Sequence, residues 1–225
     1  TVIPGIIKSL IDGIAFISNM DNVLMGEILQ VSGLEDIKAI VINIEEEGIK
    51  AITLNGEDKV KPGFKVVRNK ELFEFPVTTQ LLGRVVNAYG DPIDSNDKFK
   101  YAYLKYKVEI KAPGIISRYK VNEPLQTGIK SVDGLIPIGR GQRELIIGDK
   151  STGKTTIGID TILNQNNNNW TPATHVHCIY VSISQRRANV AKLAHLLRKK
   201  DAMSYSVILA ATASESCALQ YLIPY

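Results

Sequence analysis

The stretch Glu144-Leu145-Ile146-Ile147-Gly148-Asp149-Lys150-Ser151-Thr152-Gly153-Lys154-Thr155-Thr156 decides the fold of this chain. Its centre fits the pattern Gly, four residues, Gly-Lys-Thr, with an apolar run before it and a helical pattern after it. Gly148 and Gly153 let the backbone bend so that several N–H groups point at one anion. The helix that follows adds the positive end of its dipole. The stretch therefore predicts a phosphate-binding loop between a buried strand at 144–147 and a helix.

Two side chains of this loop have predicted roles. Lys154 is expected to reach the terminal phosphates, and the Thr155 hydroxyl is expected to bind magnesium. The predicted nucleotide-binding residues of the loop and helix start are Gly148, Asp149, Lys150, Ser151, Thr152, Gly153, Lys154, Thr155 and Thr156. A glycine-rich turn without a ligand is the structural alternative, and the strand–loop–helix context disfavours it.

Composition places the chain among ordinary globular proteins. It has 225 residues, of which 44% are hydrophobic and 22% are charged, and a formal net charge of +4. That net charge does not imply nucleic-acid binding. No apolar run approaches the roughly 18 residues of a membrane span. Cys178 and Cys217 make no disulfide framework, which favours a reducing compartment.

Residues 1–75 are predicted to form a small β-domain. Short alternating segments are separated by turn residues such as Asn55-Gly56 and Pro62-Gly63. The expected strands are 13–17, 26–31, 39–44, 49–54 and 64–67. Close spacing of short strands favours a closed barrel or sandwich, because closure removes unpaired edges. The acidic run Glu45-Glu46-Glu47 is expected to lie in solvent at a hairpin.

Residues 76–225 change in character. A strand and turn are expected at 83–94, followed by basic and aromatic residues at 98–107, which suit either nucleic-acid stacking or, as we favour, an exposed ribbon. Residues 112–143 are rich in loops, and the polar run 164–169 is expected to be a solvent loop.

The last third of the chain alternates strand and helix. Strands are predicted at 176–183 and 205–212, around a helix at 186–199. Alternation sends Cys178 to the side opposite His175 and His177, so no metal site is expected there. The alternation predicts a mostly parallel α/β sheet.

The residues resemble one family closely, the α subunits of F-type ATP synthases. The matching segments are Lys111-Ala112-Pro113-Gly114-Ile115-Ile116, Leu125-Gln126-Thr127-Gly128-Ile129-Lys130, Pro137-Ile138-Gly139-Arg140-Gly141-Gln142-Arg143-Glu144-Leu145-Ile146-Ile147-Gly148-Asp149, Ala211-Thr212-Ala213-Ser214 and Leu219-Gln220-Tyr221-Leu222. The resemblance covers essentially the whole chain. It implies an N-terminal β-barrel (1–75) and the first portion of a RecA-like P-loop nucleotide-binding domain (76–225).

Two features, the loop sequence and the residue after the 176–183 strand, separate this chain from the catalytic subunits of the same family. Asp149 and Thr152 follow the α-type loop, whereas catalytic loops resemble Gly-Gly-Ala-Gly-Val-Gly-Lys-Thr. Gln185 stands where catalytic subunits carry a glutamate that polarises the attacking water. A neutral amide cannot accept a proton as a carboxylate does. The resemblance thus implies a non-catalytic site that holds Mg²⁺ with ATP or ADP and includes Gln185.

The resemblance also implies partners and a location. These are catalytic β subunits in an alternating ring, a central rotor shaft and a peripheral stalk at the matrix side of the mitochondrial inner membrane, without nucleic acid and without a membrane span in this chain. Since family sequence beyond Tyr225 is absent, a second polypeptide or segment is expected to complete the subunit. A catalytic P-loop ATPase and a diverged scaffold that has lost nucleotide are the alternatives. Ser151, where α subunits usually have Gln, keeps the scaffold alternative open.

Overall fold

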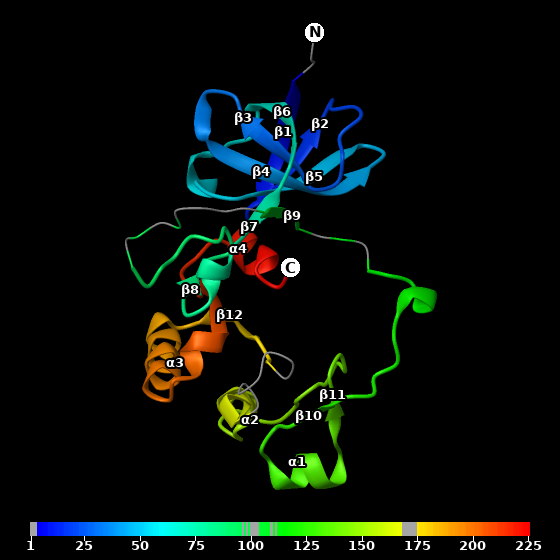
Figure 1. Ribbon diagram of the computed structural model, residues 1–225. Helices are drawn as coiled ribbons and strands as arrows, with labels where there is room; N and C mark the ends of the chain where they lie inside the picture. Colours follow the sequence, from blue (N-terminus) through cyan, green and yellow to red (C-terminus); the bar gives the residue numbers. More distant parts are fainter. Residues whose placement is uncertain are drawn as a thin grey trace.

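The computed structural model describes residues 4–95, 97, 99, 104–108, 110, 112–167 and 175–225, without the side chain of Glu35. Figure 1 shows a barrel built by the N-terminal part of the chain and, below it, an α/β region built by the remainder. A long connection, in green, runs down one side of this region before the chain returns to it. The predicted order of barrel and parallel-sheet region is confirmed.

Six antiparallel strands close the barrel in the order β1-β2-β5-β4-β3-β6. Their bounds are β1 (Gly5–Ile11), β2 (Ile14–Ser18), β3 (Glu27–Val31), β4 (Leu34–Glu45), β5 (Gly48–Thr53) and β6 (Lys65–Leu72). Alternate side chains point inward, and Ile7, Ile17, Leu29, Val41 and Ile49 are buried in one cluster. Closure between β1 and β6 rests on the pairs Gly5 with Val66 and Ile6 with Lys65. The sequence prediction missed β1 and placed the acidic hairpin run correctly, between β4 and β5.

One carboxylate lies inside the barrel wall. Glu27 is 1% exposed, and its two carboxylate oxygens accept hydrogen bonds of 2.8 Å from Nε and Nη2 of Arg68. The Leu24 amide donates to Glu27 at 3.0 Å. Burial alone would raise the pKa of Glu27, but the Arg68 and Leu24 hydrogen bonds outweigh it and hold that pKa below its ordinary value. The pair therefore joins β3 to β6 through a charge that has no access to water.

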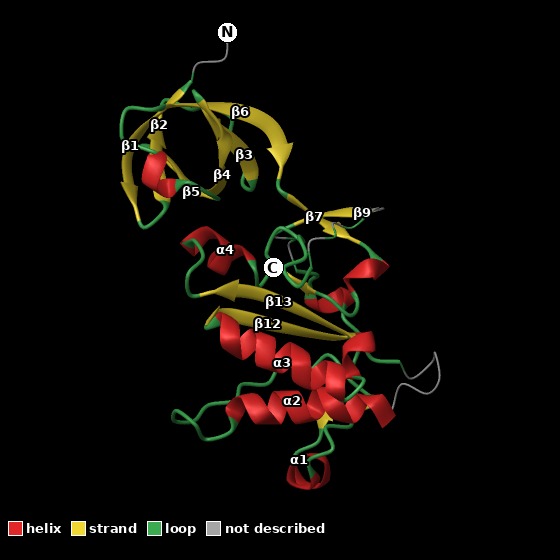
Figure 2. Ribbon diagram, turned by 90° about the vertical axis from the view of Figure 1, so that its left-hand side faces the viewer, coloured by secondary structure: helices red, strands yellow, loops and turns green. Residues whose placement is uncertain are grey.

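The α/β region contains a three-stranded parallel sheet in the order β12-β13-β8. Its strands are β12 (Cys178–Gln185), β13 (Ser206–Thr212) and the short β8 (Val85–Val86). Helix α3 (Arg187–Lys199) connects β12 to β13 and covers one face of the sheet, with Val190, Leu193, Ala194 and Leu197 buried. Figure 2 shows this layering edge-on, with α2 (Lys154–Asn164) on the far side of α3. The predicted strands and helices of the last third are confirmed to within about two residues.

Two contacts join α2 and the barrel to this sheet. The Tyr205 hydroxyl donates to the Ile162 carbonyl of α2 at 2.9 Å. The Tyr89 hydroxyl donates to the Leu54 carbonyl of the barrel at 2.9 Å, and burial raises the pKa of Tyr89 to about 12. An apolar cluster extends this second contact from Ile40 and Ile52 to the final helix α4 (Cys217–Leu222).

The remaining elements are short. They are η1 (Glu57–Lys59), β7 (Glu74–Val77), η2 (Thr79–Leu81), β9 (Leu104–Lys107), η3 (Ile115–Ser117), β10 (Pro124–Leu125), α1 (Lys130–Leu135), β11 (Ile138–Gly139), η4 (Gln165–Asn167) and η5 (Ala202–Tyr205). β7 and β9 form an antiparallel ribbon whose β9 side chains are exposed, as the ribbon interpretation predicted. The residues 98 and 100–103 of that predicted ribbon lie outside the described part of the chain.

The predicted strand at 144–147 is wrong for this structure. Residues 142–149 contain no assigned strand, and Leu145 and Ile147 are 80% and 82% exposed. A strand that is apolar on successive positions needs a neighbour on each side and a helix on each face. No described strand pairs with this segment, so its β-strand propensity alone does not place it in the sheet.

The predicted solvent loop at 164–169 also needs correction in its first part. Asn164 ends α2, and the side chain of Gln165 is 1% exposed. The Gln165 amide donates to the Gln126 carbonyl at 2.7 Å and to the Thr161 carbonyl at 3.0 Å. Hydrogen bonding to backbone carbonyls thus buries a residue whose polar neighbours suggested solvent. Residues 168 and 169 lie outside the described ranges.

A first prediction concerns the buried pair in the barrel. Arg68→Ala should lower the free energy of unfolding by about 3 kcal/mol, because it leaves the Glu27 carboxylate buried without its partner. Urea unfolding followed by circular dichroism measures the change. Lys50→Ala is the matched control, since Lys50 and Glu45 form an exposed pair worth less than about 1 kcal/mol. Equal losses in the two variants would contradict the assignment.

A second prediction concerns pH. Burial raises the pKa of Asp94, but hydrogen bonds from Arg84 and the Val85 amide, with the Arg84 charge, outweigh it and lower that pKa below its ordinary 3.8. The stability that Asp94 contributes is therefore present above pH 3.8 and is lost as the pH falls through the lowered folded-state value. Thermal melts of the native chain and Asp94→Asn should differ most near neutral pH and converge in acid. A difference in melting temperature that stays constant into acid would contradict this account of Asp94.

Candidate nucleotide-binding loop

Residues 148–153 form a tight loop directly before α2. Ser151 has φ 66° and Gly153 has φ 91°, so the backbone passes through the left-handed region at both positions. Gly153 is the N-cap of α2, and no side chain caps the helix there. At Gly148 a Cβ atom would lie 2.7 Å from Oγ1 of Thr152, which is too close for a side chain. The glycine spacing of the predicted loop thus matches two separate steric requirements.

The backbone N–H groups of the loop are free donors. Within the described part of the chain, none of the amides of residues 149–153 donates a hydrogen bond. The first amides of an α-helix also have no acceptor within the helix, and its dipole is positive at this end. Unpaired N–H groups directly before a helix N-terminus suit a phosphate. The residues present therefore fit the predicted ligand.

The side chains of Thr152 in the loop and Lys154 at the start of α2 turn back onto the loop. Nζ of Lys154 donates to the carbonyls of Gly148 and Asp149. Oγ1 of Thr152 donates to the Asp149 carbonyl at 2.8 Å. The lysine thus lies across the loop, where phosphate oxygens could replace these two carbonyls as acceptors for Nζ. Lys150, Ser151, Thr155 and Thr156 are exposed beside it.

Gln185 lies at the carboxyl end of β12. Its backbone pairs with Thr212 of β13 after a register shift at Ser184, and its carbonyl accepts from the Ala213 amide at 3.2 Å. The preceding Ser184 has φ 55°, and its hydroxyl donates to the Gln220 side chain. Figure 2 shows the carboxyl ends of β12 and β13 on the same side of the molecule as the start of α2. No hydrogen bond between described residues joins Gln185 to the loop, so the structure brings residues 148–156 together and leaves Gln185 on the neighbouring sheet.

Asp133 is a structural residue of this region that the sequence prediction missed. Its carboxylate accepts from the amide and hydroxyl of Thr127, at 2.9 and 2.6 Å, and from the Gly128 amide at 2.8 Å. These bonds, chiefly those from Thr127, lower the pKa of Asp133. These hydrogen bonds fix the turn before α1. The side-chain amide of Asn164, at the end of α2, donates to the carbonyl of the adjacent Gln126 at 3.0 Å. The spacing from Thr127 to Asp133 matches no capping pattern, so the sequence carried no signal for it.

The histidines and the Cys178 thiol are the other groups in the described residues that could bind a metal or react. The rings of His175 and His177 lie 4.5 Å apart, on one side as predicted, and no group of three potential metal ligands occurs in the ranges described. Burial raises the pKa of the Cys178 thiol to about 11, so it is not a thiolate at neutral pH.

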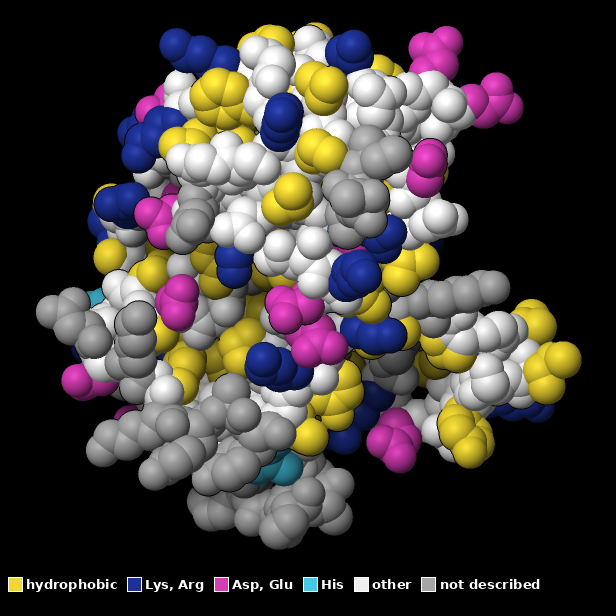
Figure 3. All heavy atoms as spheres, turned by 90° about the horizontal axis from the view of Figure 1, so that it is seen from above, with side chains coloured by type: hydrophobic (Ala, Val, Ile, Leu, Met, Phe, Trp, Pro, Cys, Tyr) yellow, Lys and Arg dark blue, Asp and Glu magenta, His cyan; other side chains and the backbone are white. Residues whose placement is uncertain are grey.

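The surface over the barrel does not resemble a nucleic-acid interface. Figure 3 views the molecule from above and shows Lys and Arg interspersed with Asp and Glu across this face. An extended basic stripe is the usual electrostatic footprint of nucleic-acid binding. The described helices include none that is long and apolar enough to cross a membrane.

Comparison with known proteins finds similarity to one group of proteins. Residues 128–225 match the family model for the nucleotide-binding domain of the ATP synthase alpha/beta family. ATP synthase subunit alpha of Rickettsia canadensis (strain McKiel) is 47% identical over 217 residues, which cover 95% of this chain and 42% of that protein. The subunit alpha of Rickettsia bellii is 48% identical over 216 residues, with 95% and 42% coverage. That of Parabacteroides distasonis is 46% identical over 222 residues, with 98% and 42% coverage.

The coverage is asymmetric. The chain spans about two fifths of the length of these curated relatives, although they align with nearly all of it. The relatives are bacterial, so they offer no support for a mitochondrial origin. The matches, with the closed barrel and the phosphate loop, support a relationship between this chain and the alpha subunit of ATP synthase.

Proposed function

We propose that this chain acts as an α-type subunit of an F-type ATP synthase and holds Mg²⁺ with ATP or ADP without hydrolysing it. The observation that carries the proposal is the loop at 148–153, whose amides of residues 149–153 donate no hydrogen bond within the described structure and which leads directly into α2 and Lys154. Such a loop binds phosphate groups by its backbone, independently of any catalytic residue. The relatives' printed name, ATP synthase subunit alpha, agrees with this role.

Each residue of the loop has a part in this proposal. The amides of residues 149–153 would hold phosphate oxygens, and Nζ of Lys154 would leave the Gly148 and Asp149 carbonyls for the terminal phosphates. The exposed Thr155 hydroxyl, one residue into α2, would bind the metal. Bound Mg²⁺ would neutralise phosphate charge. Lys150, Ser151, Thr152 and Thr156 would line the same site.

The absence of turnover rests on Gln185. Its side chain is a neutral amide at the carboxyl end of β12, where it can orient water but cannot take up a proton. General-base assistance is worth about 10²–10⁴-fold in rate. We therefore assign nucleotide at this site a structural and regulatory role toward catalytic subunits.

The assembly belongs to the same proposal. The chain would alternate with catalytic β subunits around a central shaft and a peripheral stalk, at the matrix side of the mitochondrial inner membrane. Residues 1–75 would be the barrel domain and 76–225 part of the nucleotide-binding domain. A second polypeptide or segment would supply neighbours for Leu145 and Ile147, and their exposure supports this step.

A diverged scaffold is the competing function, and one observation favours it. Lys154 donates to carbonyls of its own loop, and the segment before the loop is unpaired in the described structure. A protein that had lost nucleotide would keep this arrangement permanently. Nucleotide binding separates the two possibilities.

A third prediction tests binding. The chain should bind a fluorescent ATP analogue in the presence of Mg²⁺, and Lys154→Ala should weaken that binding by about tenfold or more, because a charge-assisted contact is lost. Thr155→Val should remove most of the dependence on Mg²⁺ and leave metal-free binding nearly unchanged.

The control for this test is Lys61→Ala, which removes an exposed charge far from the loop in sequence and should leave affinity unchanged. If neither the chain nor its purified complex binds the analogue, the scaffold function is correct.

A fourth prediction concerns turnover. The isolated chain should retain bound ATP without releasing phosphate above the background of a phosphate-release assay, since Gln185 provides no base. Phosphate release that disappears in Lys154→Ala would show hydrolysis at this site and would refute the non-catalytic role.

A further inference from the structure

The carboxyl end of β12 departs from regular strand geometry. Its ladder with β13 pairs Ile183 with Ala211 and then Gln185 with Thr212, so Ser184 is an extra residue on β12. Ser184 has φ 55°, a left-handed conformation that residues other than glycine rarely adopt. An extra residue of this kind forms a β-bulge, which redirects the side chain that follows it.

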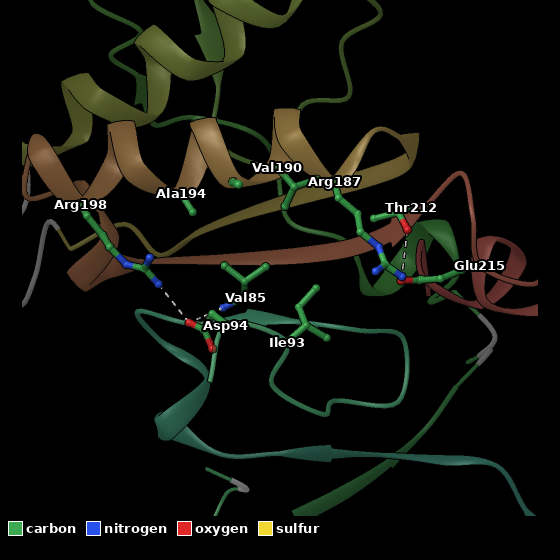
Figure 4. A pocket seen from close by; sticks show the side chains of 10 residues that line it. Val85, Ile93, Asp94, Arg187, Val190, Ala194, Arg198, Thr212 and Glu215 are labelled. Carbon is green, nitrogen blue, oxygen red and sulfur yellow. Dashed lines mark hydrogen bonds and ion pairs between the residues drawn. The ribbon is translucent and has the colours of Figure 1, made fainter. Parts of the chain in front are cut away.

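The bulge changes the face of the sheet on which Gln185 lies. Tyr180 of β12 packs against the α3 cluster, whereas Ile183 lies on the opposite face, and strict alternation would put Gln185 beside Ile183. Its partner Thr212 instead lines the same pocket as Val190 of α3, as Figure 4 shows. The register shift therefore turns Gln185 toward the side of the sheet on which α3 and α2 lie (Figure 2).

One side chain of α4 holds this bulge. Oε1 of Gln220 accepts a hydrogen bond from the Ser184 hydroxyl, and Nε2 of Gln220 donates to the Glu215 carbonyl at 3.1 Å. Glu215 lies in the turn after β13, where its amide donates to the Thr212 carbonyl at 3.0 Å and its carboxylate accepts from the Thr212 hydroxyl at 3.3 Å (Figure 4). A single amide thus joins the end of β12 to the turn that follows its neighbour.

Gln185 depends on this support, and α4 is anchored well enough to give it. The side chain of Gln185 makes no hydrogen bond to another described residue, so the backbone at 184–185 sets its direction. On α4, Leu222 packs in one cluster with Ile52 of the barrel. At the start of the same helix, the Ser216 hydroxyl donates to the Leu54 carbonyl at 3.3 Å.

We propose that Gln220 is a positioning residue of the nucleotide site, which holds the Ser184 bulge so that the Gln185 amide meets the terminal phosphate of ATP. The site thereby prefers ATP to ADP, because the amide donates to a phosphate group that ADP lacks. Without the bulge, Gln185 would return to the face of Ile183, away from the loop. The inference rests on the proposed function, since it requires nucleotide at residues 148–156.

Calorimetric titration of the full chain with ATP and with ADP, each with Mg²⁺, measures the ratio of the two dissociation constants. Gln220→Leu removes both hydrogen bonds at similar side-chain size, and Ser184→Ala removes only the hydroxyl. Each should weaken ATP binding by about fivefold and ADP binding by less than about twofold. The matched control is Ser204→Ala, which removes an exposed hydroxyl bonded to the Asp201 carbonyl at 3.0 Å and should change neither affinity.

A double-mutant cycle separates positioning from a general loss of structure. Gln185→Ala should weaken ATP binding by about fivefold, and Ser184→Ala added to Gln185→Ala should cause no further loss, because the hydroxyl acts only through Gln185. A merely structural role would weaken ATP and ADP equally and would do so in both backgrounds.

The outcomes distinguish this inference from the function on which it rests. Since Ser184 is exposed, Ser184→Ala decides the question if Gln220→Leu fails to fold. Nucleotide binding that Lys154→Ala weakens, but whose ATP-to-ADP ratio is unchanged in Ser184→Ala, would overturn the role of Gln220 and leave the proposed function standing. Additive losses in the cycle would do the same. A chain that binds neither nucleotide would refute both.

Discussion

The α/β region depends on one packing unit, the parallel ladder of β12 and β13 under α3. The ladder pairs the strands from Cys178 with Ser206 to Gln185 with Thr212, and the apolar stripe of α3 covers one face of it. Parallel strands are apolar on both faces and gain stability only when helices exclude water from them. Through this unit the Tyr205 hydroxyl holds α2, and Arg198 reaches the β8 turn by way of Asp94.

Coverage of the second face is incomplete in the described structure. Ile179, Val181 and Ile183 alternate along β12 on the side away from α3, and they are 66%, 38% and 43% exposed. The segment before the phosphate loop is exposed as well. The loop keeps its shape nonetheless, because its turn depends on positive φ at Ser151 and Gly153 and on bonds among its own atoms. The anion site that we propose there would therefore depend on local backbone and the helix end.

Two acidic side chains illustrate how a buried charge is tolerated, and a third, Glu215, shows a carboxylate without such pairing. Glu27 and Asp94 each meet an arginine in a two-point contact, and their surroundings lower the pKa of both. Glu215 has one weak donor and one oxygen without any. Paired carboxylates of the first kind hold strands together. Glu215 has no such arginine partner within the described structure, and it joins no strands in this way.

The sequence by itself determined the local features. Alternation and turn residues indicated five of the barrel strands, 3.6-residue periodicity indicated α3, and glycine spacing with Lys154 indicated the loop, because each depends on residues close together in the chain. Only the tertiary structure decided which segments meet. It paired β8 with β13, buried Gln165 against the Gln126 carbonyl, placed Arg68 on Glu27 and left Leu145 and Ile147 without neighbours. Such contacts join residues tens of positions apart, and burial, which sets their energy, exists only once the chain has folded.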